Sequence, residues 1–390
     1  MMNIHVLSAG DRNNYGDLLF PLIVKKYIFK YKPTYEFENY GIIVSDLSSF
    51  GALPTKSLTD LKNNIKNEST DSMIIVAGGE VLGGGDWLNI LRFVSPLWDK
   101  INSIRVFRGL VKKTDILNRL SKNRYECSRP FILDGKVFQG KKVIYNAIGA
   151  ISIRSLLSKK IYKNYFENIQ YLSVRDQISK NNFNHFGIKP NLSPDSALIM
   201  SDLLNEDLVR NISVECQKIV SEKYIFLQLG NNKGPDDIKK FIEVIKKLSQ
   251  KINAKVLLCP IGLALGHGDD VILKEIETLE KEFSYYEPKN LYETMFLLKN
   301  TEIYIGTSLH GMVTAQSFGR PYFLFTEKIS KLKFYIETWN SANTNCFGDF
   351  YDYEEMLKRY SQYDLVFENK TLQNQKQMVY ENFKRIFENA

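Results

Sequence analysis

The chain has 390 residues, of which 44% are hydrophobic and 13% aromatic, so it carries ample apolar material for packed cores and is not a disordered protein. At roughly 150 residues per domain, this length predicts two to three domains. Lys and Arg total 52 against 44 Asp and Glu, which gives a net charge of +8. That excess fits a nucleic-acid binder, a membrane-surface protein or an enzyme for anionic substrates, and does not choose among them.

The cysteines indicate neither a disulfide framework nor a zinc site. The four of them, Cys127, Cys216, Cys259 and Cys346, are scattered, without a CxxC pair or a histidine at ligand spacing. We therefore expect buried reduced thiols and no metal site. The N-terminus lacks the pattern of a signal peptide, and the longest apolar stretch, around 256–265, is about half of a bilayer span. The sequence predicts a soluble, cytoplasmic protein.

The first half of the chain alternates short apolar runs with amphipathic ones, a rhythm typical of a parallel sheet covered by helices on both faces. We expect this half to form a Rossmann-like domain over residues 1–204. The elements predicted in it are a strand at 2–8, a helix at 18–29, and strands at 72–77, 142–147 and 171–174.

The second half repeats the rhythm after a polar helical bridge at 205–222. We expect a second Rossmann-like domain over 223–368, and a C-terminal helix over 369–390 that packs back on the first domain. The fold class is thus α/β, with two Rossmann-like domains facing a cleft. The predicted elements are strands at 224–229, 255–260, 302–305 and 321–325, and helices at 238–249, 291–299 and 311–318.

Residues 105–142 interrupt this pattern with many basic side chains and aromatics between them. A nucleic-acid-binding patch has such a composition, but no nucleic-acid-binding motif accompanies it. We interpret the segment as a solvated insertion in the first domain.

Ligands of open α/β sheets bind beyond the carboxyl ends of the strands, and the first such end carries Asn14-Tyr15-Gly16-Asp17 before a helix. Gly16 allows the backbone to approach a ligand closely. Asp17 could cap the helix or act as an acid or base. Its position alone does not decide between these roles.

Glycines follow the second strand, beginning with Gly78 and Gly79. Their backbone N–H groups could face a phosphate or a carboxylate. The spacing matches neither GxGxxG nor a P-loop, so the cluster indicates an anion site, or a tight turn without a ligand.

The third candidate is Ser173-Val174-Arg175-Asp176, where an arginine follows a strand directly. Its planar guanidinium suits a carboxylate or a phosphate, whereas a surface ion pair with Asp176 is the alternative. Downstream, Pro194-Asp195-Ser196-Ala197 places a further carboxylate, that of Asp195, near the expected cleft.

The fourth candidate is the sharpest, because Gly306-Thr307-Ser308 breaks a strand and His310 stands where the next helix begins. A helix N-terminus favours a neutral imidazole until an anion binds. His310 therefore suits a proton shuttle or an anion-binding group. His267 follows another strand and is a weaker candidate.

Taken in order, these segments resemble the polysaccharide pyruvyl transferase family. The matching pieces are Asn14 to Asp17, the glycines from Gly78, Ser173 to Asp176, Pro194 to Ala197, and Thr307-Ser308-Leu309-His310-Gly311 followed by Gly319-Arg320-Pro321. The resemblance implies a fold like that of GT-B glycosyltransferases and a reaction in which phosphoenolpyruvate gives a sugar a pyruvate ketal. It implies no cofactor beside phosphoenolpyruvate as co-substrate.

The resemblance also implies site residues. Family members hold the donor with an Arg and a His, which correspond to Arg175 and His310, and some have a Lys about twenty residues after the His, to which Lys328 is similar in position. From the chemistry of ketal formation, rather than from the resemblance, we expect Asp17 or Asp195 to be the base toward the sugar. We expect Gly78, Gly79, Ser308, Leu309 and Gly311 to contact the donor. Many members carry Arg where this chain has Ser308, so donor binding is expected to be either weaker or supplied by another cation: Lys328, Arg320 or Arg154.

Three other readings stay open. A nucleotide-sugar glycosyltransferase of GT-B type would hold ribose with Asp269 or Asp270, a non-catalytic relative would bind glycan or phosphate without turnover, and a nucleic-acid module is the third. Our preferred partners are phosphoenolpyruvate and a sugar acceptor, lipid-linked or part of a cell-surface polysaccharide, with no nucleic acid. The remaining positive charge is expected to favour peripheral contact with the inner face of an anionic membrane.

Overall fold

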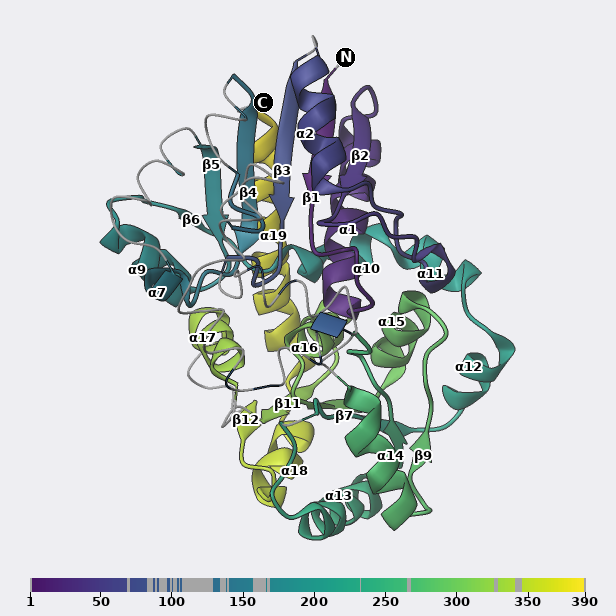
Figure 1. Ribbon diagram of the computed structural model, residues 1–390. Helices are drawn as coiled ribbons and strands as arrows, with labels where there is room; N and C mark the ends of the chain where they lie inside the picture. Colours follow the sequence, from purple (N-terminus) through teal and green to yellow (C-terminus); the bar gives the residue numbers. More distant parts are fainter. Residues whose placement is uncertain are drawn as a thin grey trace.

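The computed structural model contains two parallel sheets, one above the other, with helices around each (Figure 1). Continuous stretches that the structure describes are 2–68, 71–82, 129–133, 140–156, 169–231, 233–264, 268–325, 329–340 and 346–388. Isolated described positions lie between 87 and 166. Most of the basic segment 105–142 lies outside the described residues, so its role stays a prediction.

The first sheet has six parallel strands in the order β2-β1-β3-β4-β5-β6. Its central strand β3 reads SMIIVA and is buried over its whole length, as expected of a strand covered on both faces. The strands are β1 (Asn3–Leu7), β2 (Glu36–Tyr40), β3 (Ser72–Ala77), β4 (Lys142–Ile148), β5 (Ile169–Val174) and β6 (Asn191–Leu192). The helices of this half are α1 (Tyr15–Tyr31), the short η1 (Ser48–Phe50), α2 (Leu58–Asn67), α7 (Ile153–Leu156) and α9 (Gln177–His185).

The second sheet also has six parallel strands, in the order β12-β11-β10-β7-β8-β9. Its strands are β7 (Tyr224–Gln228), β8 (Lys255–Leu258), β9 (Ser284–Tyr285), β10 (Ile303–Gly306), β11 (Tyr322–Phe325) and β12 (Phe347–Gly348). The helices are α13 (Ile238–Ile252), α14 (Asp269–Leu279), α15 (Leu291–Asn300), α16 (Leu309–Ser317), α17 (Ser330–Trp339) and α18 (Tyr353–Ser361). The two parallel α/β sheets confirm the predicted fold class.

Short helices link the two halves: η2 (Ser196–Ile199), α10 (Met200–Leu203), α11 (Asn205–Arg210) and α12 (Val214–Ile219). One hydrophobic cluster runs from α1 in the first half, through η2, to α16 in the second. Within it the Tyr15 hydroxyl lies 2.9 Å from Thr314 Oγ1. The shared core fixes how the two halves face each other.

The C-terminal helix α19 (Leu365–Glu388) crosses from the second half and lies along the first sheet (Figure 1). Asn382 on this helix donates to Asn146 Oδ1 of β4 at 2.7 Å and accepts from the Tyr171 hydroxyl of β5 at 2.9 Å. The predicted packing of the tail on the first half is therefore observed, with the helix beginning a few residues earlier than expected.

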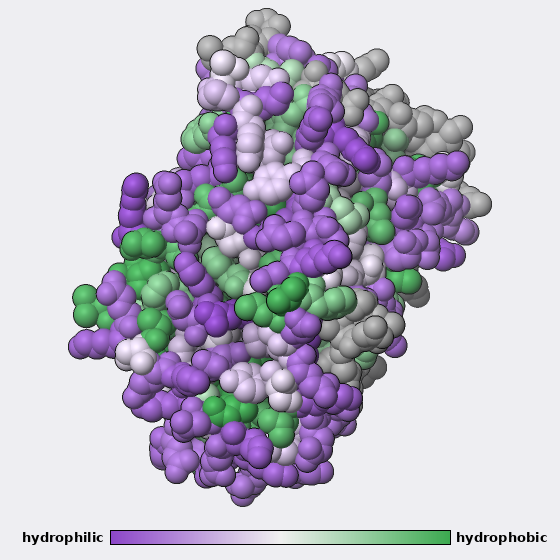
Figure 2. All heavy atoms as spheres, turned by 180° about the vertical axis from the view of Figure 1, so that it is seen from behind, coloured by the Kyte–Doolittle hydropathy of each residue, from purple (hydrophilic) through white to green (hydrophobic). Residues whose placement is uncertain are grey.

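Three of the four cysteines, Cys216, Cys259 and Cys346, are described, and all three are buried free thiols. Among the described helices, none combines the length and apolarity required to cross a membrane. On the face shown in Figure 2 the surface is largely hydrophilic, and its apolar side chains form separate small groups.

Candidate active site

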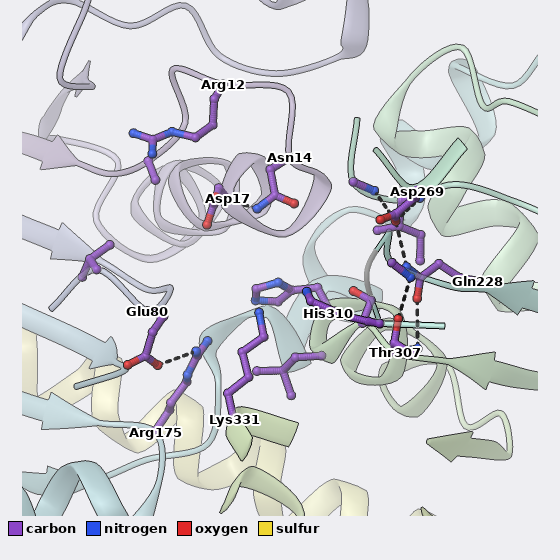
Figure 3. A pocket seen from close by; sticks show the side chains of 18 of the residues that line it. Arg12, Asn14, Asp17, Glu80, Arg175, Gln228, Asp269, Thr307, His310 and Lys331 are labelled. Atoms are coloured by element: carbon purple, nitrogen blue, oxygen red, sulfur yellow. Dashed lines mark hydrogen bonds and ion pairs between the residues drawn. The ribbon is translucent and has the colours of Figure 1, made fainter. Parts of the chain in front are cut away.

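A cavity of about 230 Å³ opens between the two halves at the carboxyl ends of both sheets. The loops after β1 and β3 line it on one side, and the loops after β7 and β10 line it on the other. In each sheet these two strands are neighbours whose connections leave in opposite directions. Such switch points are where open parallel sheets bind ligands. Figure 3 shows the side chains that converge there.

Arg175 follows β5 and is almost wholly buried at the first half's side of the cavity. Its Nη1 donates to Asp195 Oδ2 at 3.0 Å. Its Nη2 donates to Glu80 Oε2 at 3.1 Å, the bond drawn in Figure 3. Burial disfavours the guanidinium charge, but the two carboxylates outweigh burial and raise the pKa of Arg175. The alternative, a surface ion pair with Asp176, is not among these contacts, since Asp176 caps α9 by accepting from Ser179 N at 2.7 Å.

The two carboxylates on Arg175 are not equivalent. Asp195 is fully buried, and His310 and Arg175 overcome the effect of burial to lower its pKa. Glu80 accepts from Ile151 N at 2.8 Å, but burial raises its pKa more than Arg175 lowers it. The two shifts favour the anionic form of Asp195 and make Glu80 the carboxyl group that takes up a proton more easily.

His310 lies in the first turn of α16, as the sequence predicts, and lines the cavity. Its Nε2 is 3.6 Å from Asp195 Oδ2, and the Phe20 ring packs edge-on against the imidazole with centroids 5.2 Å apart. A Cβ on Gly16 would stand only 1.7 Å from His310 Nδ1. Gly16 is thus required because the imidazole packs directly on its backbone.

Ser308 is the N-cap of α16, and its Oγ accepts from Gly311 N at 3.3 Å. Ser308 and Leu309 line the cavity, whereas the N–H of Gly311 is used by this cap. The first N–H groups of a helix have no intrahelical acceptor, which leaves this end of α16 suited to an anion.

Asp17 lines the cavity from the first turn of α1, beside His310 (Figure 3). The capping alternative does not describe its side chain, because Asp17 Oδ2 accepts from the Asn14 side chain at 2.7 Å. The other carboxylate oxygen, Oδ1, has no hydrogen-bond partner among the described residues.

Gly78 and Gly79 both adopt the left-handed conformation, with φ of +58° and +74°. The Gly78 N–H donates to Asn146 O at 3.1 Å, and a Cβ on Gly78 would meet the Phe20 ring at 2.1 Å. Neither glycine lines the cavity, so the contacts are those of a tight turn that holds Phe20 against His310. Their donor-binding role stays a prediction.

The sequence did not point to Lys331, which lies in the first turn of α17 and reaches into the cavity next to His310 (Figure 3). Burial, and then the charges of Lys233 and Arg175, lower its pKa to about 8. The available signal was the spacing of a lysine about twenty residues after the histidine, and Lys331 satisfies it as Lys328 does. Lys328 itself, like His267, lies outside the described residues.

Other expected groups stand elsewhere. Arg320 donates to Lys299 O at 2.6 Å and Arg154 is exposed, and neither lines the cavity. Asp269 lines the cavity, but its Oδ2 accepts from Gln228 Nε2, Ile261 N and Gly262 N at 2.8–3.2 Å. Among the described residues no group of acidic, histidine and cysteine side chains is arranged to hold a metal ion.

A family model for polysaccharide pyruvyl transferases matches residues 14–329 of the chain, a range that contains all of the strand-end motifs. The chain belongs to the polysaccharide pyruvyl transferase family. No sequence relative is found among the curated proteins.

Several solved structures share this architecture at low sequence identity. The UDP-GlcNAc 2-epimerase of Methanocaldococcus jannaschii is 14% identical, with a TM-score of 0.55 over 93% of this chain and 92% of that one. The corresponding enzyme of Rickettsia bellii is 8% identical, with a TM-score of 0.54 over 100% and 96%. The Anabaena protein HepE, solved with UDP-glucose, is 10% identical, with a TM-score of 0.51 over 98% and 100%. These likenesses show the GT-B-like fold, and no more.

Proposed function

We propose that the protein transfers the pyruvyl group of phosphoenolpyruvate to a sugar of a cell-surface polysaccharide or its lipid-linked precursor, forming a pyruvate ketal and releasing phosphate. The observation that carries this proposal is the cluster of His310, Lys331 and the Arg175–Asp195 pair at one cavity in a member of this family. Phosphoenolpyruvate carries a phosphate and a carboxylate, and such a ligand requires fixed cations and oriented N–H groups.

The reaction requires one proton for the methylene carbon and the removal of two hydroxyl protons from the acceptor. In the proposed mechanism His310 protonates the methylene carbon, which leaves an oxocarbenium-like centre at the neighbouring carbon. One acceptor hydroxyl attacks this centre and gives its proton to a base. The second hydroxyl displaces the phosphate, which leaves with the second proton, so that atoms and charge balance.

Asp17 is the better candidate for the base toward the sugar. It lines the cavity and has one carboxylate oxygen without a described partner, whereas Asp195 is wholly buried, paired with Arg175 and held below its ordinary pKa. Asp195 is suited instead to orient His310 and to stabilise the imidazolium form.

The two acidic residues proposed to bind ribose in the nucleotide-sugar alternative are both engaged elsewhere. Asp269 is committed to three internal hydrogen bonds through one oxygen, and Asp270 pairs with Lys274 at 3.3 Å on the surface. Neither carboxylate is therefore well placed to accept both hydroxyls of a ribose, and we favour the pyruvyl transfer.

The test is incubation with phosphoenolpyruvate and a panel of lipid-linked and synthetic oligosaccharides. We expect phosphate release together with an acceptor that gains the mass of one pyruvate less one water. The His310→Ala variant, checked for its fold by circular dichroism, is expected to lose about 10²- to 10⁴-fold in rate, the usual contribution of a general acid.

The outcomes separate the alternatives. Unchanged turnover in folded His310→Ala protein would remove His310 from the chemistry. Saturable phosphoenolpyruvate binding without release of phosphate on any acceptor would favour the non-catalytic reading, and binding of UDP-sugars alone would favour a glycosyltransferase.

A further inference from the structure

Two lysines reach the cavity from different elements of the second half. Lys331 comes from the first turn of α17, and Lys233 comes from the loop after β7. Both side chains are half-buried. Among the described residues, neither ammonium group makes a hydrogen bond or an ion pair. Arg175 differs from them, because both of its Nη atoms are occupied by carboxylates.

The loop that carries Lys233 is fixed to the loop that carries His310. Gly230 N donates to Thr307 Oγ1 at 2.8 Å, and Lys233 N donates to Gly230 O at 3.0 Å in a tight turn. A Cβ on Gly230 would stand 3.1 Å from Lys233 Cδ, so the aliphatic stem of the lysine runs across this glycine. The backbone thus holds Lys233 against the loop that carries Thr307 and Ser308, and all three residues line the cavity.

The ammonium group of Lys233 is close enough to disfavour the charge of Lys331. Apart from burial, Lys233 is the largest influence that lowers the pKa of Lys331, whereas Glu80 and Asp17 only partly oppose it. Lys331 also lies at a helix N-terminus, where the helix dipole disfavours a cation. Two like charges held in one cavity without a described counter-ion are relieved by a ligand that carries two negative charges.

We propose that Lys233 and Lys331 form a two-lysine site for the dianionic phosphate group of the donor, in which Lys233 supplies the positive charge that Ser308 cannot. This inference rests on the proposed function only for the identity of the donor. Lysine binds phosphate as a point charge, and the pair supplies two such charges at the second half's wall of the cavity. The monoanionic carboxylate of the donor lies away from this pair, toward Arg175.

The experiment measures dissociation constants by calorimetry with inorganic phosphate and with pyruvate, which carries the carboxylate alone. Lys233→Met is expected to weaken phosphate binding about 10- to 100-fold, the usual effect of losing a charged hydrogen-bond partner. Pyruvate binding should change less than about threefold. Lys239→Met is the matched control, because Lys239 is exposed on α13 outside the cavity and should leave both constants unchanged.

A second substitution tests the geometry. If Lys233 takes the place of a cation at position 308, the double variant Lys233→Met with Ser308→Arg should regain at least about tenfold of the lost phosphate affinity. Phosphate affinity in Lys233→Met within twofold of the wild type overturns the proposal, and so does a larger loss for pyruvate than for phosphate. A double variant no better than the single one also overturns it.

These readouts need no turnover, so the two proposals can fail separately. Lysine-dependent phosphate binding in a protein that releases nothing from phosphoenolpyruvate would remove the proposed function and keep the site. Normal turnover with unchanged phosphate affinity in Lys233→Met would remove the two-lysine site and keep the proposed function.

Discussion

The two walls of the cavity are built on opposite electrostatic principles. On the wall from the first half, Arg175 is matched by Asp195 and Glu80, and Arg12 is matched by Asp11 at 2.8 Å. On the wall from the second half, Lys233 and Lys331 have no salt bridge to any described residue, and the pKa of Lys331 is lowered to about 8. On the first wall the arginines are neutralised by neighbouring carboxylates, whereas on the second wall the two lysines have no described counter-ion.

This difference suits the paired cations to hold neighbouring side chains in place and the unpaired cations to bind an anionic ligand. A cation tied to buried carboxylates has a fixed place and contributes to stability, but it must share its donors with any ligand. A cation without a partner costs free energy in the empty protein and recovers it when an anion binds. A basic side chain therefore has opposite effects on stability on the two walls, and substitutions can show this.

The largest expected effect is that of Arg175→Met on stability. The substitution leaves Asp195 and Glu80 without their common cation in a buried site, and breaking a buried pair in this way costs about 3–5 kcal/mol. Urea unfolding should show the loss as a lower midpoint at unchanged slope. A loss below about 1 kcal/mol would mean that this wall is not held by its charges.

Gly16→Ala should give the next largest effect, because the new methyl group would overlap the His310 ring. We expect a loss of stability of about 1–3 kcal/mol and a larger loss of turnover, since the imidazole must move away from Asp195. Gly10→Ala is the milder control: its Cβ meets nothing closer than the Ser8 hydroxyl at 3.0 Å. Equal behaviour of the two variants would contradict the packing of His310 on Gly16.

The affinity for phosphoenolpyruvate should fall as the pH rises above about 8, because Lys331 then loses its proton in the free protein. A bound anion raises the pKa of Lys331, so binding takes up a proton, and the affinity declines by up to about tenfold per pH unit. Calorimetry in buffers of different ionisation enthalpy measures this uptake. Lys331→Arg should remove it, and a flat profile in the wild type would show that Lys331 does not meet the ligand.

The smallest effect is that of Lys331→Met on the stability of the unliganded protein. We expect no loss, and a gain of up to about 1 kcal/mol at pH 7, where Lys331 is charged at a cost. The gain should shrink between pH 8 and 10.5, since the unfolded state binds the proton more tightly there and the wild type recovers. A clear loss of stability in Lys331→Met would mean that Lys331 is paired in the unliganded protein, as Arg175 is.

Much of the fold follows from periodicity in the sequence. The long apolar strands, such as β3 at Ser72–Ala77, were predicted because both of their faces are buried. The edge strands β6, β9 and β12 were missed, since two residues each carry no period. The helix predicted at 18–29 begins earlier, at Tyr15. The prediction placed its start too late because Asn14 and Gly16 are residue types typical of a turn.

The residues of the candidate site were also predicted only in part. Glycines and polar residues directly after strands led to His310, Arg175, Asp17 and Asp195, because sheet topology brings strand ends together. Lys233 was missed because it reaches the cavity from the fifth residue of the loop after β7, where composition gives no signal. Lys331 was missed because the spacing after His310 was assigned to Lys328. The pairing of Arg175 with Glu80 depends on Gly149, whose Cβ would stand 2.0 Å from Glu80 Oε2, and only the structure reveals such a contact.

The central claim is that the cavity binds phosphoenolpyruvate and that the second half supplies its charge. It is tested most directly by calorimetric titration of the wild type and of Lys331→Met with phosphoenolpyruvate and with UDP-glucose. The account predicts saturable binding of phosphoenolpyruvate that weakens about 10- to 100-fold in Lys331→Met, and no binding of UDP-glucose. Binding of UDP-glucose alone, or phosphoenolpyruvate binding that is indifferent to Lys331, would contradict it.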